Sequence, residues 1–387
     1  MNNPSLSNNV ATRSPSSGRR LLSLDVLRGL TVALMILVNN AGDGAVSYAQ
    51  LRHSVWNGCT LTDIVFPLFL FMIGASIALS LRSRLARGTA RSAILLQVLK
   101  RSVLIAAIGL LLNALPYFSM STLRFYGVLQ RIALCYALGS LVFLFGGVAA
   151  CIVAIVAALG GYWFLLLHVA VPGIGLPGVT VGVLDPYCNL ASWLDRLLVP
   201  AAHLYHHGIY DPEGLLSTIP AVATTLLGVL SVGWLQTTRP AGRKAVALLL
   251  CGLILLVCGL LWSHNFPINK RLWTSSYVLF TGGISMVLLA SLFWAIDGPY
   301  QLRRGLTPWL VFGTNALAAY VLSEVLAIAL AAIRMPLGGN LQQSLFHLLP
   351  HWLGPPPLVS MIYSVFFVLV CAIPLIPLYR RKIFLKL

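Results

Sequence analysis

Residues 62–81 read TDIVFPLFLFMIGASIALSL, a run of twenty residues in which Asp63 is the single charged side chain. An α-helix rises about 1.5 Å per residue, so a run of this length spans roughly 30 Å, the thickness of the hydrocarbon core of a bilayer. Lipid cannot satisfy backbone hydrogen bonds, whereas a helix satisfies them within the segment. The run therefore predicts a membrane-spanning helix.

The composition extends this prediction to the whole chain. Of 387 residues, 58% are hydrophobic and 9% are charged, and the mean hydropathy is +0.88, a balance that excludes a water-soluble globular protein. It also argues against a nucleic-acid partner, because soluble nucleic-acid binders do not consist of long apolar runs. We predict an all-α, polytopic transmembrane bundle of about ten helices, at residues 21–40, 62–81, 94–115, 125–145, 148–169, 215–235, 245–262, 275–296, 309–333 and 358–378.

The basic residues predict how the bundle is oriented. Lys and Arg exceed Asp and Glu by 26 to 9, and most of them lie in alternate connections, as expected of cytoplasmic loops. We expect both termini to be cytoplasmic, with residues 1–20 a disordered basic tail and residues 21–387 a single domain. The longer connections, 41–61, 172–214, 263–274 and 335–357, are then extracytoplasmic, and we expect any chemistry to face outward.

Ionisable residues within apolar helices suggest function, because burying them in a membrane is costly. Asp25 and Arg28, three residues apart, share a helix face and can form an ion pair, although Arg28 can also reach the interface. Asp63 suits a helix cap. Arg131 and Glu324 are expected to pair with each other or with a ligand.

A second group of polar residues is the segment HLYHHG, His203–Gly208. Imidazole is a common metal ligand, but no acidic or thiol partner stands at ligand spacing. We therefore predict no metal site.

The densest polar group lies between the first two predicted helices. Asn39 ends an apolar helix, and His53, Asn57 and Asp63 follow within 24 residues. A helix end places an amide donor rigidly, and a histidine of ordinary pKa, about 6.5, can accept a proton near neutral pH. From these residues alone, a catalytic loop and an ordinary polar loop both remain open.

The blocks SLDVLRGLTVALMILVNN and LRHSVWNGCTLTDIVFPLFLFMIGASIALS resemble the heparan-α-glucosaminide N-acetyltransferase family and its bacterial homologues. RFYGVLQRIALCY, YDPEGLLSTIPAVATTLLG, FPINKRLWTSSYVLFTGG and FGTNALAAYVLSE follow in the family's order. The lumenal domain of the lysosomal members has no counterpart in the short N-terminal tail. The resemblance implies a membrane acyltransferase that moves acetyl from cytosolic acetyl-CoA to an extracytoplasmic amino sugar of the glucosamine type.

The resemblance also implies roles for single residues. The family's essential histidine matches His53, and its helix-end asparagine matches Asn39. We expect His53 to act as a base or as an acetyl carrier, and Asn39 to stabilise the thioester oxygen. Asp25, Asp63 and Glu324 would be structural or tuning residues.

Further polar residues are candidates for binding the two substrates. For acetyl-CoA the candidates are Arg28, Arg101, Arg131 and Asn315, although basic residues near the cytoplasm also serve topology. For the acceptor the candidates are Asn57, Asp211, Glu213, Asn269, Lys270 and Trp273, although an Asp-Pro-Glu-Gly segment also suits a turn before a helix.

Two other functions stay open from the sequence: a sugar permease and a non-catalytic component of amino-sugar utilisation. The expected location is the inner membrane of a bacterium, among lipids, with the active loop facing the periplasm. A homodimer is one option for its assembly.

Overall fold

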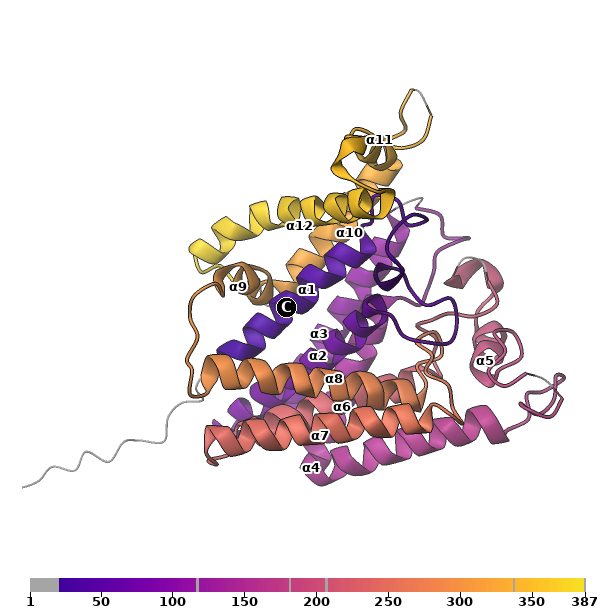
Figure 1. Cartoon of the computed structure of the whole chain (residues 1–387). Coiled ribbons are helices and arrows are strands. Elements are labelled where there is room, and N and C mark those ends of the chain that lie inside the picture. Colours follow the sequence, from indigo (N-terminus) through magenta and orange to yellow (C-terminus); the bar gives the residue numbers. More distant parts are fainter. Residues whose placement is uncertain (1–20, 116–117, 181, 206–207, 337, 386–387) are drawn as a thin grey trace, which may run out of the picture.

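The computed structural model describes residues 21–115, 118–180, 182–205, 208–336 and 338–385, so the predicted tail, residues 1–20, lies outside the described residues. In this part of the chain the elements are helices, with a few isolated backbone bridges, as the prediction of an all-α bundle requires (Figure 1). The helices are α1 (Leu22–Asn39), α2 (Leu61–Ala86), α3 (Arg91–Ala114), α4 (Val128–His168), α5 (Leu190–Leu198), α6 (Thr218–Leu235), α7 (Ala241–Trp262), α8 (Ser275–Leu292), α9 (Thr307–Thr314), α10 (Ala316–Ala332), α11 (Leu341–His347) and α12 (Pro356–Arg380).

Eight of the described helices are long and apolar enough to cross a membrane. The pair α9 and α10 is apolar enough to make a ninth span if the two helices cross the membrane together, and it is bent by 83° at Asn315. The bend is fixed by the Asn315 side chain, which donates to the Ile383 carbonyl oxygen and accepts from the Leu385 amide. The sequence prediction of one continuous helix over 309–333 is therefore wrong at this point, because an amide that serves the C-terminal segment interrupts it.

The 41 residues of α4 make two spans rather than one. Gly147 has φ 63° and ψ −151°, which breaks the helix at its middle. Near the start of α4, the Arg131 guanidinium lies over the Trp273 ring. Near its end, the Tyr162 hydroxyl donates to the carbonyl oxygen of Leu272, the neighbour of Trp273. A straight helix would separate these two residues by roughly 46 Å, so the chain folds back at Gly147. Counted this way, each of the ten predicted runs corresponds to a helical segment.

The centre of the bundle is formed by α2 and α6. Their apolar windows are 72% and 78% buried, against 22% in α3 and α7. Gly74 of α2 and Gly228 of α6 allow the contact, since a Cβ on either would overlap a backbone carbonyl of the other helix. Small residues at close helix crossings are typical of membrane bundles, where van der Waals packing drives association. The exposed apolar faces of α3 and α7 are suited to lipid.

The two ends of the bundle differ in chemistry. At one end, α2 finishes and α3 begins among Arg82, Arg84, Arg87 and Arg91. At the other end, α1 finishes at Asn39, α2 begins at Leu61, and the loops over 41–60 and 263–274 meet. The candidate site lies at this second end.

Candidate active site

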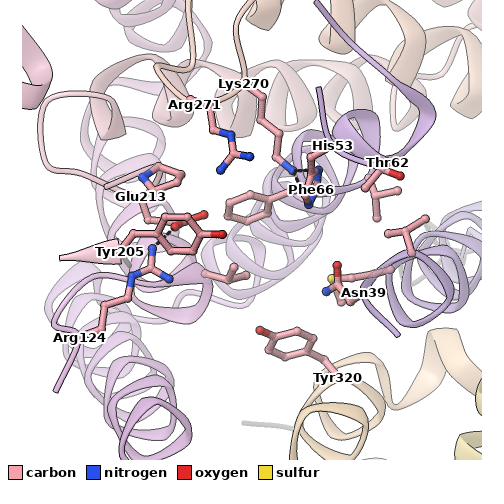
Figure 2. Close-up of a pocket in the computed structure, with 15 residues that line it drawn as sticks. Asn39, His53, Thr62, Phe66, Arg124, Tyr205, Glu213, Lys270, Arg271 and Tyr320 are labelled. Atoms are coloured by element: carbon pink, nitrogen blue, oxygen red, sulfur yellow. Dashed lines mark hydrogen bonds and ion pairs between the residues drawn. The ribbon is translucent and has the colours of Figure 1, made fainter. Parts of the chain in front are cut away.

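A cavity of about 190 Å³ opens where α1 ends and α2 begins (Figure 2). Its walls come from seven separate stretches of the chain: Met35, Val38, Asn39; His53; Thr62, Val65, Phe66; Arg124, Val128; Tyr205, Pro212, Glu213; Lys270, Arg271; and Tyr320. Asn39, His53, Glu213 and Lys270, which the sequence singled out, thus share one cavity. Apolar side chains contribute to the lining, and charged groups face each other across the cavity.

Asn39 is placed by the end of α1. It is the last residue of the helix and its side chain is exposed to the cavity. The adjacent Asn40 is buried and donates to the Ile36 carbonyl oxygen, one turn back. The two amides therefore differ in function, because one closes the helix and the other faces the open space. Glu324 of α10 interacts with the Asn39 side chain.

His53 is oriented by Asp63 at the start of α2. Its Nδ1 lies 2.8 Å from Asp63 Oδ1, and the Asp63 carboxylate is almost fully buried. The other carboxylate oxygen accepts from the Ser54 and Thr60 amides, at 3.0 and 3.1 Å. Asp63 therefore caps α2 and holds the His53 ring. A carboxylate behind an imidazole is the arrangement that orients a catalytic histidine.

Lys270 joins this pair from the opposite loop. Its Nζ lies 2.9 Å from His53 Nδ1 and 3.5 Å from Asp63 Oδ1. Burial lowers the pKa of Lys270, while Asp63 and Glu213 oppose the shift. In Figure 2 the His53 ring and the Lys270 ammonium meet on one side of the cavity.

The loop that carries His53 is fastened to the loop that carries Lys270. The Gly58 amide donates to the Ile268 carbonyl oxygen at 2.8 Å, and Asn269 Nδ2 donates to Asn57 Oδ1 at 3.0 Å. Gly58 has φ 111°, in the region that glycine tolerates best. The WNG segment is thus a connector between loops. Asn57 and Asn269 were predicted to bind the acceptor, and the structure places them in this connection instead of in the cavity wall.

The facing wall is an ion-pair cluster. Arg124 Nε donates to Asp211 Oδ2 at 2.8 Å, and its Nη2 donates to Glu213 Oε2 at 2.5 Å. Asp211 is buried behind the wall, whereas Glu213 lines the cavity. Burial acts to raise the pKa of Glu213, but the positive charges of Arg124 and Arg131 outweigh it and lower the pKa, which favours the ionised carboxylate. The wall therefore presents a negative group that can receive hydroxyl or ammonium donors.

Sequence reasoning missed two arginines and two tyrosines of this cavity: Arg124, Tyr205, Arg271 and Tyr320. Arg124 and Arg271 had a signal, because each lies in a connection predicted to be outside, where basic residues are depleted. Tyr205 and Tyr320 had none, since a tyrosine at a helix face or in a loop is ordinary.

Other predicted residues lie away from the cavity wall. Trp273 is buried and donates from Nε1 to Thr224 Oγ1. Arg131 donates to the Gly214 carbonyl oxygen and to Ser217 Oγ, and within the described residues these are its hydrogen-bond partners rather than Glu324. Both residues support the walls behind the cavity.

The remaining candidates for acetyl-CoA are dispersed. Arg28 bonds to Asp25 and to Ser76 Oγ, both at 3.0 Å, so the predicted ion pair with Asp25 is present. Arg101 reaches the Tyr136 hydroxyl at 3.5 Å. Asn315 binds the C-terminal segment, as described above. The structure does not bring these residues together with Arg131 in one cavity.

No group of three or more metal-ligating side chains occurs among the described residues. His203 Nδ1 lies 2.8 Å from the Leu123 carbonyl oxygen, and its ring stacks on Phe125. His206 and His207 lie outside the described residues. The comparisons with known proteins bear on the rest of the site.

A family model described as heparan-α-glucosaminide N-acetyltransferase, catalytic, matches residues 20–176. The heparan-α-glucosaminide N-acetyltransferase of Mus musculus is 32% identical over 363 residues, covering 80% of this chain and 54% of the relative. That of Homo sapiens is 31% identical over 359 residues, covering 79% and 53%. The chain belongs to the heparan-α-glucosaminide N-acetyltransferase family. It spans about half the length of these curated relatives.

The family model covers part of each of the two facing walls of the cavity. Asn39, His53 and Asp63 fall within residues 20–176, and so does Arg124. Glu213 and Lys270 lie beyond that range. The cavity of this family member is therefore completed by the second half of the chain.

Proposed function

We propose that the protein is a membrane-embedded acetyltransferase that moves acetyl from acetyl-CoA to an amino sugar. The observation that carries this proposal is the cavity in which Asn39, His53, Lys270 and Glu213 meet. Acyl transfer needs a base or nucleophile, a donor for the thioester oxygen and a site for the acceptor. His53, Asn39 and Glu213 offer these three functions.

Two chemical routes fit His53. In a ternary complex, the acceptor nitrogen attacks the thioester carbon, the C–S bond breaks and an amide C–N bond forms. His53 Nε2 takes the proton that the nitrogen loses and passes it to the CoA thiolate. In a ping-pong route, His53 Nε2 attacks the thioester carbon and the C–S bond breaks, so that CoA leaves as the thiolate. The acceptor nitrogen then attacks the acetyl carbon and releases the imidazole, which passes the proton lost by the nitrogen to the thiolate. Both routes give the acetylated amine and CoA thiol.

Asn39 and Glu213 act on opposite partners in either route. The Asn39 amide donates a hydrogen bond to the thioester oxygen as negative charge develops there, a contribution of about 3 to 4 kcal/mol when well aligned. Glu213, held by Arg124, accepts hydroxyl or ammonium donors of the sugar. The end of α1 positions Asn39, and the hydrogen bond from Arg124 positions Glu213.

The location follows from the layout of charges. We propose that the cavity faces the periplasm from a bacterial inner membrane, because the basic connections lie at the opposite end of the bundle. Acetyl-CoA is then supplied from the cytosolic side. A glucosamine-type sugar is the acceptor that the family suggests.

The test is turnover of acetyl-CoA by detergent-purified protein offered glucosamine and glucosaminyl oligosaccharides. We expect an acetylated sugar from the wild type and at least a hundredfold loss in His53→Ala, with an unchanged elution profile. His203→Ala is the matched control, since that ring stacks on Phe125 outside the cavity. Wild-type protein that neither binds nor consumes acetyl-CoA would overturn the proposal.

A further inference from the structure

The cavity is lined by three cationic side chains that are always or usually charged, and two of them have carboxylate partners. Arg124 is paired with Glu213 on one wall, and the Lys270 ammonium lies 3.5 Å from Asp63 Oδ1 on the other. Arg271 is the third. Within the described residues its guanidinium forms no ion pair and donates no hydrogen bond. The cavity therefore contains one positive group whose charge is left for a ligand to balance.

The surroundings of the Arg271 guanidinium leave its N–H groups available. Its Cζ lies 6.0 Å from the centroid of the Tyr205 ring, and a ring face attracts a cation without supplying an oxygen acceptor. Figure 2 shows the guanidinium directed into the cavity, on the side of the Lys270 ammonium. The two cations repel each other, so a negative group between them is favoured. The planar fork of an arginine matches the oxygens of a carboxylate, sulfate or phosphate.

The backbone that carries Arg271 is fixed on both sides. Asn269 Oδ1 accepts from the Leu272 amide at 2.9 Å, and the Trp273 amide donates to the Lys270 carbonyl oxygen at 3.2 Å. The side chains of Leu272 and Trp273 are buried, and they anchor the turn. A guanidinium presented by a fixed turn binds an oxyanion at a lower cost in conformational entropy.

We infer that Arg271 forms an oxyanion subsite, so that the acceptor is an amino sugar that itself carries a carboxylate, sulfate or phosphate group. This inference rests on the proposed acetyl transfer in the same cavity. Glu213 offers a carboxylate to the hydroxyl or ammonium donors of the sugar, and Arg271 offers donors to its acidic group. A sugar with both kinds of group is complementary to both residues, whereas a neutral amino sugar leaves Arg271 without a partner.

The size of the cavity assigns the oxyanion to the sugar rather than to acetyl-CoA. His53 and Arg271 line one cavity of about 190 Å³. The phosphates of acetyl-CoA are separated from its thioester by the whole pantetheine arm, which is longer than a cavity of this volume is wide. With the thioester at His53, the phosphates lie outside the cavity. An acidic substituent on the ring that bears the reacting amine lies within it.

The experiment measures acceptor binding and requires no turnover. The probes are glucosamine and three acidic relatives, glucosamine 6-phosphate, glucosamine 6-sulfate and muramic acid, titrated calorimetrically into detergent-purified protein at pH 7. We expect at least one acidic probe to bind the wild type roughly tenfold more tightly than glucosamine does, because hydrogen bonds between charged partners are strong. In Arg271→Gln we expect that preference to be lost.

Two further variants serve as controls. Arg271→Lys keeps the charge but not the planar fork, so it should retain part of the preference. Arg334→Gln removes a cation that is exposed and does not line the cavity, and it should retain all of it.

Two results would overturn the inference: equal binding of neutral and acidic probes by the wild type, or a preference that persists in Arg271→Gln. The wild-type comparison decides alone if Arg271→Gln does not fold. A loss of affinity for acetyl-CoA instead of the acidic sugars in that variant would also overturn it, because the oxyanion would then belong to the coenzyme. Failure of the proposed function is seen separately, as wild-type protein that acetylates none of these sugars.

Discussion

Two amide side chains at adjacent positions show how much a single residue's place matters. Asn39 is exposed to the cavity and Asn40 is buried against its own helix. Identical chemistry therefore leaves an amide facing the cavity at one position and gives a helix-terminal hydrogen bond at the next. The difference arises because α1 ends between them.

Replacing Asn39 by Ala tests the donor at this scale. We expect kcat to fall by roughly a hundred- to a thousandfold, the usual effect of removing one oxyanion donor, with little change in the thermal midpoint. Asn40→Ala should lower the midpoint and leave kcat within a few-fold. Steady-state turnover and fluorescence-detected unfolding of both variants measure the two effects. Near wild-type turnover in Asn39→Ala would remove that residue from the mechanism.

Residues of the site were predictable from the sequence where their chemistry is unusual for their surroundings. A histidine and a helix-end asparagine beside an apolar run are such cases, and His53 and Asn39 do share the cavity. The contact of His53 with Lys270 was not predictable, because 217 positions separate them and only the fold joins their loops. Asp63 was predicted as a helix cap, but its contact with His53 depends on the path of the loop between these two residues.

At the scale of elements, the short helix α5 supports the wall that carries Glu213. Asp195 of α5 is buried and accepts from the Asp211 and Leu215 amides, both at 3.3 Å. Gly214 lies against the same carboxylate, where a Cβ would overlap it. The segment around Glu213 is therefore held by α5 through backbone hydrogen bonds.

This arrangement predicts a pH-dependent stability. Burial, assisted by Asp211, raises the pKa of Asp195 to about 7 from an ordinary value of 3.8. When the pKa of a carboxyl is higher in the folded state than in the unfolded state, its protonated form stabilises the fold. The contribution of Asp195 to the free energy of unfolding is therefore full below about pH 4 and is lost as the pH rises through 7. In Asp195→Asn we expect the thermal midpoint to fall less between pH 4 and pH 7 than in the wild type.

A nearby carboxylate serves as the control for that series. The Asp185 carboxylate accepts hydrogen bonds from the Tyr187 and Cys188 amides. Burial acts to raise the pKa of Asp185, but these hydrogen bonds outweigh it and lower the pKa. The contribution of Asp185 to stability changes with pH in the opposite direction to that of Asp195, since it is lost as the pH falls. In Asp185→Asn the thermal midpoint should therefore fall between pH 4 and pH 7 by at least as much as in the wild type. An unaltered decline in Asp195→Asn would show that Asp195 does not titrate in this range.

The class of the whole molecule was predictable, because the length of each apolar run is set by the bilayer. The break at Gly147 was predictable as well, since it falls between the predicted helices 125–145 and 148–169. The bend at Asn315 was not, because Asn315 bends the chain through a contact with residues 383–385. That bend depends on a tertiary contact rather than on local pattern.

The arrangement of the whole bundle leads to a prediction about its orientation. The cavity lies at the end where α2 begins, and Arg82, Arg84, Arg87 and Arg91 lie at the other, so the cavity should face away from the cytoplasm. Val55 is 91% exposed beside the cavity, and Thr89 is exposed at the basic end. With Cys59 and Cys188 replaced by Ser, a membrane-impermeant maleimide should label Val55→Cys in intact spheroplasts. Thr89→Cys should be labelled only after permeabilisation. The reverse pattern would place the cavity on the same side as acetyl-CoA, and the transfer would then need no passage across the membrane.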